Sequence, residues 1–286
     1  MVGAREVLPE LDILPPQRQR RWTVLLRVLL VIPQYIAMAV LGIAGWVVMV
    51  IAWFGALALG RLPVWCAEFL GGCLRYATRV TSYLFLLVDT YPPFQWSPQH
   101  HPVSVQLAPG RLNRAAVLFR FILYIPAAFM TAFLGVGWTI LAVFFWLTVL
   151  ILGRMPRPVF DATAAVLRYT MRAQAYLMML TSAYPKWLFG DRALVAPDPD
   201  WQQPVPPRPS STRPLLLSPG GRALLIVIIV LGVLGYIWQN IGSAVLQNRD
   251  LDTDGTPDQI QVVATLWGYH PALNGSVAVA PDTLPF

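Results

Sequence analysis

Two long apolar runs dominate the sequence and limit what it can fold into. The first run, Val24 to Leu59, contains 36 residues with Arg27 as its one charged side chain, and the second covers Ala115 to Leu152. As a single helix, a run of this length would measure about 54 Å, whereas the hydrocarbon core of a bilayer is about 30 Å thick. Each run is therefore too long for one ordinary crossing of a membrane.

Glycines near the middle of each run indicate how it turns. The first run contains Gly-Ile-Ala-Gly-Trp at 42–46, and the second contains Gly-Val-Gly-Trp at 135–138. Glycine permits tight turns, and tryptophan favours the membrane interface. Each run is therefore predicted to form a helical hairpin, over about 22–60 and about 114–153. Its arms of about 16–20 residues either cross a thinned bilayer or stop inside it as a wedge.

The composition agrees with a membrane protein. Hydrophobic residues make up 56% of the chain and charged residues 12%, with a mean hydropathy of +0.56. A soluble domain usually has about 25% charged residues, so this chain has too little polar surface for a soluble enzyme. Its high hydrophobicity also excludes a disordered chain. The predicted class is an all-α integral membrane protein.

The chain contains two copies of one unit. A shift of 93 positions aligns residues 21–94 with residues 114–187 without a gap, and 26 of the 74 pairs are identical. Apolar composition alone does not place Gly, Pro, Arg and Tyr in register, so the repeat reflects a duplication. The identical pairs include Arg21/Arg114, Arg27/Arg120, Pro33/Pro126, Trp53/Trp146, Arg61/Arg154, Arg75/Arg168, Arg79/Arg172, Tyr83/Tyr176 and Tyr91/Tyr184.

An amphipathic helix is predicted after each hairpin, over about 64–89 and about 157–183. It follows a Gly-Arg-x-Pro stop, and one acidic and two basic residues at relative positions 0, 7 and 11 fall on one of its faces. These residues are Glu68, Arg75 and Arg79 in the first copy and Asp161, Arg168 and Arg172 in the second. Such a helix lies along the membrane interface or leans into the bundle.

The chain divides into five segments. They are a first membrane repeat (1–94), a second membrane repeat (95–190), a proline-rich linker (191–219), a transmembrane helix (220–246) and a small acidic tail (247–286). Basic clusters flank both hairpins, and basic loops of membrane proteins face the cytoplasm. The sequence therefore predicts five crossings, a cytoplasmic N-terminus and an extracytoplasmic tail.

Several short motifs of the repeat resemble a known family. A basic-Trp opening, Ile-Pro in the first arm, Gly-Arg-x-Pro, Leu-Arg-Tyr-x-x-Arg and Tyr-Pro-Pro-Phe occur in this order in the first copy. Together they resemble an uncharacterised family of bacterial multipass membrane proteins, a domain of unknown function that is often duplicated. The resemblance covers residues 10–187, although the second copy ends in Tyr-Pro-Lys-Trp. The resemblance supports the architecture and the class, and no activity comes with it. The expected location is the bacterial inner membrane.

The repeated charges are candidates for ion pairs or for contacts with lipid headgroups. Arg27 and Arg120 lie inside the predicted hairpins, where they either reach out to the headgroups or pair with Glu68 and Asp161. The pairs Arg75/Arg79 and Arg168/Arg172 place like charges four residues apart, which repel. Anionic lipid phosphates would relieve that repulsion, and a solvated face is the alternative.

The sequence contains no catalytic constellation that we can identify, so an enzyme is not expected. It has no Gly-rich phosphate loop, dinucleotide-binding motif or nucleophile elbow. A non-catalytic protein that organises or scaffolds membrane proteins or lipids is the predicted function, and a subunit of a transporter or channel is the alternative. The expected partners are the lipid bilayer, with anionic lipids among its components, and other membrane proteins, but not nucleic acid.

The acidic tail contains a candidate calcium loop. Asp250, Asp252, Asp254 and Asp258 occupy positions 1, 3, 5 and 9 around Gly255. Alternate carboxylates can converge on one Ca²⁺ while the glycine permits the sharp turn. Gln261 replaces the bidentate Glu of an EF-hand at position 12, so a solvated acidic turn is the alternative. No other cofactor is predicted.

Overall fold

The computed structural model describes residues 8–14, 18–96, 101–107, 110–190, 212, 215–247, 269–271 and 277–279. The chain forms two compact units, residues 1–233 and 234–286. In the first unit the elements are β1 (Glu10–Ile13), α1 (Arg21–Leu59), α2 (Val64–Leu84), β2 (Val103–Gln106), α3 (Arg114–Leu118), α4 (Arg120–Leu152), α5 (Arg157–Leu177) and the first half of α6 (Pro219–Gln247). The second unit contains the end of α6 and an antiparallel pair, β3 (Tyr269–Pro271) and β4 (Val277–Val279).

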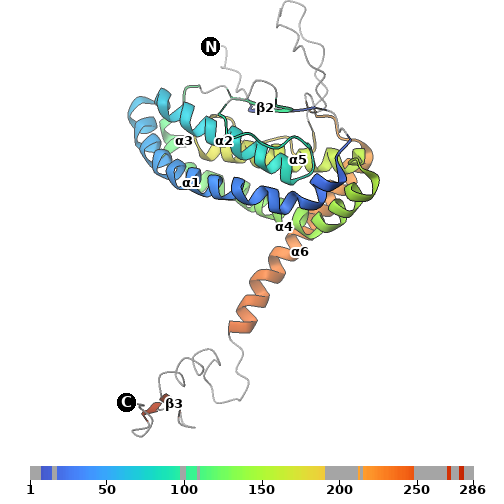
Figure 1. Ribbon diagram of the computed structural model, residues 1–286. Helices are drawn as coiled ribbons and strands as arrows, with labels where there is room; N and C mark the ends of the chain where they lie inside the picture. The colour runs from blue at the N-terminus through green and yellow to red at the C-terminus, as the bar shows by residue number, and fades with distance from the viewer. Residues whose placement is uncertain are drawn as a thin grey trace, which may run out of the picture. The chain divides into compact units, whose positions relative to one another are not determined.

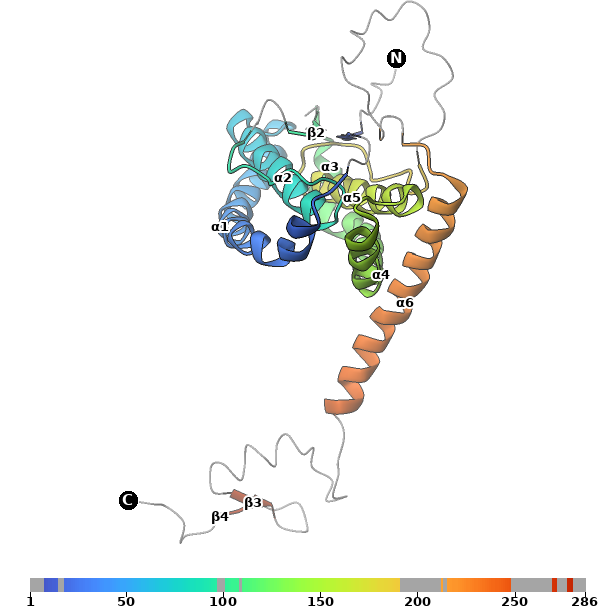
Figure 2. The same ribbon diagram turned by 45° about the vertical axis from the view of Figure 1, so that its right-hand side comes forward.

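The two repeats of the first unit share three layers, as Figures 1 and 2 show. The antiparallel strands β1 and β2 form the upper layer, and α2 and α5 lie beneath them. The long helices α1 and α4 form the lowest layer, where α1 packs along α2 and α4 packs along α5. The predicted all-α membrane fold with two tandem units is therefore confirmed, with a small two-stranded sheet added.

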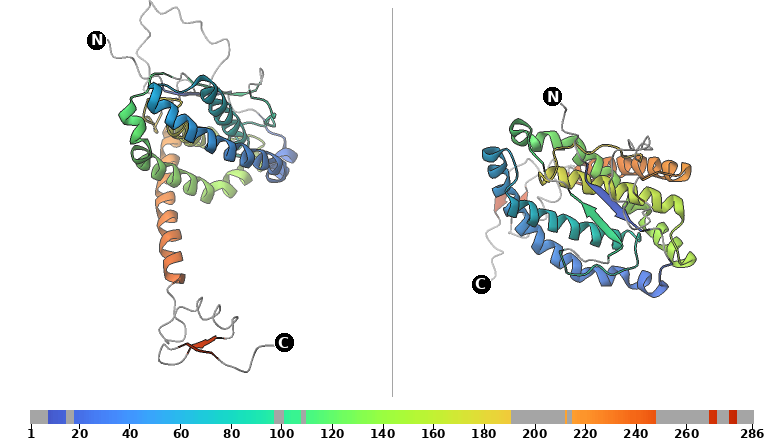
Figure 3. Two further views of the ribbon diagram at one scale, coloured as in Figure 1. Left: turned by 90° about the vertical axis from the view of Figure 1, so that its left-hand side faces the viewer. Right: turned by 90° about the horizontal axis from the view of Figure 1, so that it is seen from above.

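The long apolar runs are curved helices rather than hairpins. α1 is one helix of 39 residues, and α4 is one helix of 33 residues, so the turn predicted at 42–46 does not occur. A break inside an apolar segment would leave backbone N–H and C=O groups unpaired in lipid, which costs several kcal/mol for each group. Glycine within a helix costs only about 1 kcal/mol. Pro33 and Pro126 lie inside these helices, and both helices bend (Figure 3).

The ends of α1 explain why it bends. At about 1.5 Å per residue, α1 is roughly 58 Å long, whereas the 21 residues of α2 measure about 31 Å. Four residues connect the end of α1 to the start of α2, and the N–H of Arg20, just before α1, donates to Asp89 (3.3 Å), just beyond α2. Because both ends are held near the ends of a helix half as long, α1 must bow outward. We call α1 and α4 the two arches.

The outer faces of the arches are apolar and uncovered. The residues of α1 that are buried in the protein follow a narrow stripe with a spacing of about 3.5 residues, from Val24 to Ala56. Between them, large apolar side chains such as Ile43, 71% exposed, and Trp46 point outward. An apolar surface of this extent is typical of a face that contacts a membrane or another protein. Three helices, α1, α4 and the first part of α6, are long and apolar enough to span a membrane, whereas the sequence analysis predicted five crossings.

The two repeats are related by a pseudo-two-fold axis between β1 and β2. Glu10 pairs with Gln106, and Ile13 pairs with Val103. A shift of 93 places Val103 at the position of Glu10 and Gln106 at the position of Ile13, so the repeat turns each pair into the other. The indole N–H of Trp53 donates to the Val117 carbonyl (3.0 Å), and its counterpart Trp146 donates to the Val24 carbonyl (2.8 Å). The indole bond therefore occurs twice, once in each direction between the repeats.

The same exchange caps the carboxyl ends of the arches. Arg114 donates to the Ala58 carbonyl at the end of α1 (3.0 Å), and Arg21 donates to the Ile151 carbonyl at the end of α4 (3.2 Å). The last carbonyls of a helix have no partner within the helix and carry partial negative charge. Each arch therefore depends on an arginine of the other repeat. Because the axis relates the repeats without inverting them, both arches lie on the same side of the unit (Figure 1).

The start of α6 packs closely on the second repeat. Ser218 donates its N–H to the Asp161 carboxylate (3.1 Å), and α6 then crosses α4 at Gly137 and Gly232. A Cβ at Gly137 would overlap the Ile228 carbonyl of α6. Glycine at this crossing lets the two backbones touch, as in close helix pairs of membrane proteins.

We expect Gly137→Ala to weaken the packing of α6 on α4, because the added methyl group meets backbone rather than a movable side chain. Overpacking of this kind costs about 1–3 kcal/mol, and the melting temperature in detergent should fall by several degrees. Gly135→Ala is the matched control on the same helix, since nothing lies within 4 Å of a Cβ there. Equal melting temperatures for the two variants would contradict the close crossing.

Candidate functional site

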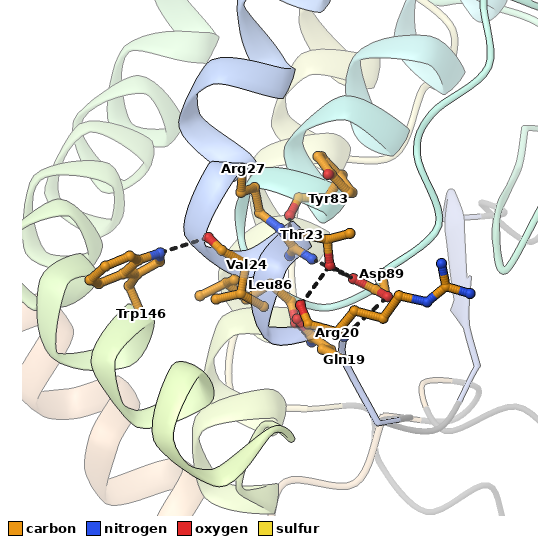
Figure 4. A network of polar contacts seen from close by, with 9 residues as sticks. All are labelled: Gln19, Arg20, Thr23, Val24, Arg27, Tyr83, Leu86, Asp89 and Trp146. Carbon is orange, nitrogen blue, oxygen red and sulfur yellow. Dashed lines mark hydrogen bonds and ion pairs between the residues drawn. The ribbon is translucent and has the colours of Figure 1, made fainter.

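Arg27 of the first arch is buried against the end of α2. It is 1% exposed, and its guanidinium lies over the Tyr83 ring, 4.3 Å from the ring centroid. Nη1 donates to the Tyr83 carbonyl (2.8 Å), and Nη2 forms an ion pair with Asp89 (3.1 Å). Figure 4 shows these groups converging between α1 and α2. Arg27 therefore fastens the arch to the helix above it.

The end of α2 is shaped to receive this arginine. Leu86 has a left-handed conformation (φ 62°), and the N–H groups of Leu86 and Leu87 return to the carbonyls of Tyr83 and Ser82. These two backbone hydrogen bonds form the Schellman motif that ends a helix. The carbonyls of the last turn carry partial negative charge, so a buried cation is stabilised there.

Asp89 connects the start of the first arch to the end of α2. Besides Arg27, its Oδ1 accepts a hydrogen bond from the Thr23 hydroxyl (2.7 Å), and its Oδ2 accepts the N–H of Arg20. The side-chain amide of Gln19 donates to the Leu86 carbonyl beside it (Figure 4). The carboxylate thus neutralises the buried guanidinium and satisfies the first turn of α1.

We call the buried arginine, together with the carbonyls and the tyrosine ring that bind it, the arginine clamp. The second repeat has the same clamp without the carboxylate. Arg120 is 3% exposed, donates to the carbonyls of Tyr176 (2.6 Å) and Thr181, and lies 4.1 Å from the Tyr176 ring centroid. Met179 (φ 61°) repeats the left-handed turn of the first copy. A shift of 93 places Ser182, which is exposed, at the position of Asp89. The two clamps therefore share their geometry but differ in charge.

The predicted pairs of Arg27 with Glu68 and of Arg120 with Asp161 are wrong. The arginines lie at the carboxyl ends of α2 and α5, whereas the acids lie in the first two turns of these helices, about 15 residues or roughly 22 Å away. Glu68 is exposed, and Asp161 binds the start of α6 instead.

Three other candidate arginines are buried and hold the loops that follow α2 and α5. Arg79 donates to the carbonyls of Gln95 and Trp96, Arg168 donates to the carbonyl of Trp187 (2.8 Å), and Arg172 donates to the carbonyls of Pro9 (3.0 Å) and Lys186 (3.2 Å). Burial lowers the pKa of Arg79. These side chains are directed into the protein rather than toward a lipid surface.

Arg75 differs from these arginines because it is only partly buried and lines an open cleft. We call this the first-repeat cleft. It has a volume of about 960 Å³, and the residues that characterise it are Arg61, Trp65, Glu68, Arg75, Trp96 and Arg111. The cleft combines three arginines with two indoles. The equivalent surface of the second repeat binds the start of α6.

No metal site is found within the described residues, which contain no group of three or more His, Cys, Asp or Glu side chains suited to one ion. The candidate calcium ligands Asp250, Asp252, Asp254 and Asp258 lie outside the described residues. The calcium loop therefore stays a prediction.

His101, in the loop before β2, is buried and titrates abnormally. Its Nδ1 accepts the N–H of Val103 (3.1 Å), and its Nε2 is buried without a partner within the described structure. Burial, with a further contribution from Arg79, lowers the pKa of His101 to about 4. The folded protein therefore holds this imidazole in its neutral form.

The sequence analysis did not identify Asp89 or the cross-repeat tryptophans as structural residues. Trp53/Trp146 and Tyr83/Tyr176 are identical pairs of the repeat, so the 93-residue shift was the available signal for them. Asp89 has no such signal because its counterpart is Ser182.

We expect Asp89→Ala to destabilise the protein because it leaves the Arg27 guanidinium buried without its counterion. Asp89 is about a fifth exposed (22%), and water compensates in part, so the loss should be roughly 2 kcal/mol rather than the 3–5 kcal/mol of a fully buried pair. Thermal unfolding in detergent measures it. Ser182→Ala, at the equivalent position, should change the stability by less than about 0.5 kcal/mol, and a similar loss in both variants would argue against the ion pair.

The stability of the protein should fall between pH 6.5 and pH 4 through His101. Because the folded-state pKa is lower than that of the unfolded chain, the unfolded state binds more protons in this interval. This linkage lowers the free energy of unfolding by at most about 1.4 kcal/mol per pH unit as the pH falls, and the contribution is complete above pH 6.5. His101→Gln should flatten the pH dependence of the melting temperature, and an unchanged slope would rule out this group.

Comparison with known proteins agrees with the duplication seen in the structure. No curated protein and no solved structure matches the chain. A family model for a domain of unknown function, DUF4389, matches residues 21–95 and again residues 114–188, which together are just over half of the chain. Each match covers one arch, the helix above it and the Tyr-Pro segment. The chain therefore belongs to the DUF4389 family and contains two tandem copies of its domain.

Proposed function

We propose that this protein is a non-catalytic membrane scaffold whose two arches embed side by side in one face of a bilayer, beneath the layer formed by α2 and α5. In that position it would organise the lipids or the membrane proteins around it. The observation that carries this proposal is that both ends of each arch return to the same layer of the protein.

The hydrogen bonds at the arch ends support a shallow insertion. At one end, Gln19 donates its N–H to the Gly153 carbonyl, and at the other end, Leu112 donates its N–H to the Gly60 carbonyl, both at 2.9 Å. A helix that crosses a bilayer separates its ends by about 30 Å along the membrane normal. An arch that is held at both ends inserts only its middle, around Ile43 and Trp46, and so acts as a wedge.

The polar groups of the repeats support a structural role rather than a transport pathway. Arg27, Arg79, Arg120, Arg168 and Arg172 are all bonded to backbone carbonyls within the protein. A pore or a transport site needs polar groups that face a water-filled path. A subunit of a transporter or channel is therefore the second candidate, and ion or dye flux is its test.

The topology follows from the positive-inside rule. The basic residues at both ends of each arch would lie in the cytoplasm of a bacterial cell, with the protein in the inner membrane. In this arrangement the apolar helix α6 crosses the bilayer and leads to an extracytoplasmic C-terminus.

Reconstitution of the purified protein into vesicles tests the scaffold. We expect it to convert spherical vesicles into smaller or tubular ones, as seen by electron microscopy, because two wedges expand one leaflet. Ile43→Lys with Trp46→Lys should abolish this effect by placing two charges at the middle of the first arch. Gln106→Lys, on the exposed side of β2, is the control and should keep full activity.

Unchanged vesicles with the wild-type protein, or remodelling that the arch variant retains, would contradict the proposal. Dye leakage through the wild type but not through the arch variant would favour a channel. Single cysteines at Arg18 and Arg61, in a chain without Cys66 and Cys73, should react with an impermeant maleimide from the same side of the membrane. Reaction from opposite sides would show that α1 crosses the bilayer.

A further inference from the structure

The first-repeat cleft brings together three arginines that form no ion pair with any residue that the structure describes. An isolated antiparallel bridge pairs the backbones of Arg61 and Arg111, so their side chains start from neighbouring positions, and Arg75 reaches the cleft from α2. Within the described residues, none of these guanidinium groups forms a hydrogen bond or an ion pair with the protein. With Glu68 as the one acid among the lining residues, the cleft has a formal charge of +2.

The rest of the cleft is apolar and aromatic. Trp65 is 53% exposed, Val64 is also exposed, and the Trp96 indole packs so closely against Gly72 that a Cβ there would overlap the ring. Indole side chains favour the level of the lipid headgroups and the upper acyl chains. The cleft therefore combines the two chemistries of a phospholipid, a charged head and an apolar chain.

The equivalent groove of the second repeat is already filled. A shift of 93 places Pro158 at the position of Trp65 and Asp161 at the position of Glu68, and both are in contact with the start of α6. Gly220 packs against Pro158, Ser218 donates to Asp161, and the neighbouring Leu215 and Leu217 are buried. The same surface is thus a binding groove in one repeat and an open cleft in the other.

We propose that the first-repeat cleft binds one anionic phospholipid, with its phosphate held by Arg61, Arg75 and Arg111 and its acyl chains lying against Val64 and the two tryptophans. Guanidinium groups form strong bidentate hydrogen bonds with phosphate oxygens, and a bound anion removes the repulsion among three like charges. Basic pockets on the cytoplasmic side of membrane proteins bind headgroups in this way. Glu68 accepts a hydrogen bond from a hydroxyl of the headgroup, so phosphatidylglycerol is the appropriate probe.

This site is separate from the proposed scaffold activity. Its lining residues lie outside α1 and α4, and the apex residues Ile43 and Trp46 are not among them. Charge removal in the cleft should therefore leave vesicle remodelling unchanged, and an apex variant should leave lipid binding unchanged. The two proposals can fail independently.

Native mass spectrometry of the full-length protein in a neutral detergent tests the site. We expect one molecule of phosphatidylglycerol to remain bound per chain, in preference to phosphatidylcholine by about tenfold or more. The double variant Arg61→Gln with Arg111→Gln should weaken binding of phosphatidylglycerol by about tenfold. Arg154→Gln, the counterpart of Arg61→Gln next to the filled groove, should bind like the wild type.

Several outcomes would overturn the proposal. Equal retention of phosphatidylglycerol and phosphatidylcholine, or equal losses in the Arg154 and Arg61/Arg111 variants, would show that the cleft does not recognise the headgroup. Displacement of the lipid by millimolar inorganic phosphate would identify a site for a soluble phosphate compound. Displacement by an equimolar peptide of residues 212–222 would show that the cleft takes a polypeptide, as the second groove does.

Discussion

A buried arginine at the carboxyl end of a neighbouring helix is the interaction on which each repeat depends. Arg27 and Arg120 leave apolar helices to bind the last carbonyls of α2 and α5, and an aromatic ring covers each guanidinium. In lipid, an arginine without such partners would have to reach the headgroups. Because the carbonyls are fixed by the Schellman turns, the arginine fixes where the arch begins. The curvature of the arch follows from this attachment and from the short connection at its other end.

The two repeats share the buried arginine and the tyrosine that binds it, but they differ at other positions. Asp89 supplies a counterion in the first repeat, whereas in the second repeat Arg120 binds two backbone carbonyls and the Tyr176 ring. Likewise, Asp161 holds the start of α6, whereas Glu68 lies in an open cleft. Identical pairs such as Trp53/Trp146 and Arg21/Arg114 form the bonds between the repeats, whereas positions that differ, such as Trp65/Pro158, lie on the surface that α6 covers in the second copy alone. The start of α6 therefore covers this surface in the second repeat. None of the described residues covers the first-repeat cleft.

The sequence predicted the membrane class, the duplication and the helices α2, α5 and α6. Apolar composition and periodicity can be recognised in a short segment, and the duplication can be recognised by comparing the chain with itself at a shift of 93. It did not predict the arches. Glycines at 42–46 are compatible with a turn or with a helix, and the choice depends on whether backbone groups find partners in their surroundings. The partner of Arg27 was missed for a related reason. Asp89 lies beyond the end of α2, where only the three-dimensional path of the loop brings it to the guanidinium.

The reciprocal bonds join the two tandem domains of this chain. The last carbonyls of each arch are bound by an arginine of the other repeat, and the indole of each arch donates to a carbonyl of the other repeat. Each repeat contains both the arginine and indole donors and the carbonyl acceptors. These donors bind carbonyls of the other repeat. In water such groups could bind solvent, whereas near lipid each unpaired group is costly. In this chain, each of the two DUF4389 domains therefore completes hydrogen bonds of the other.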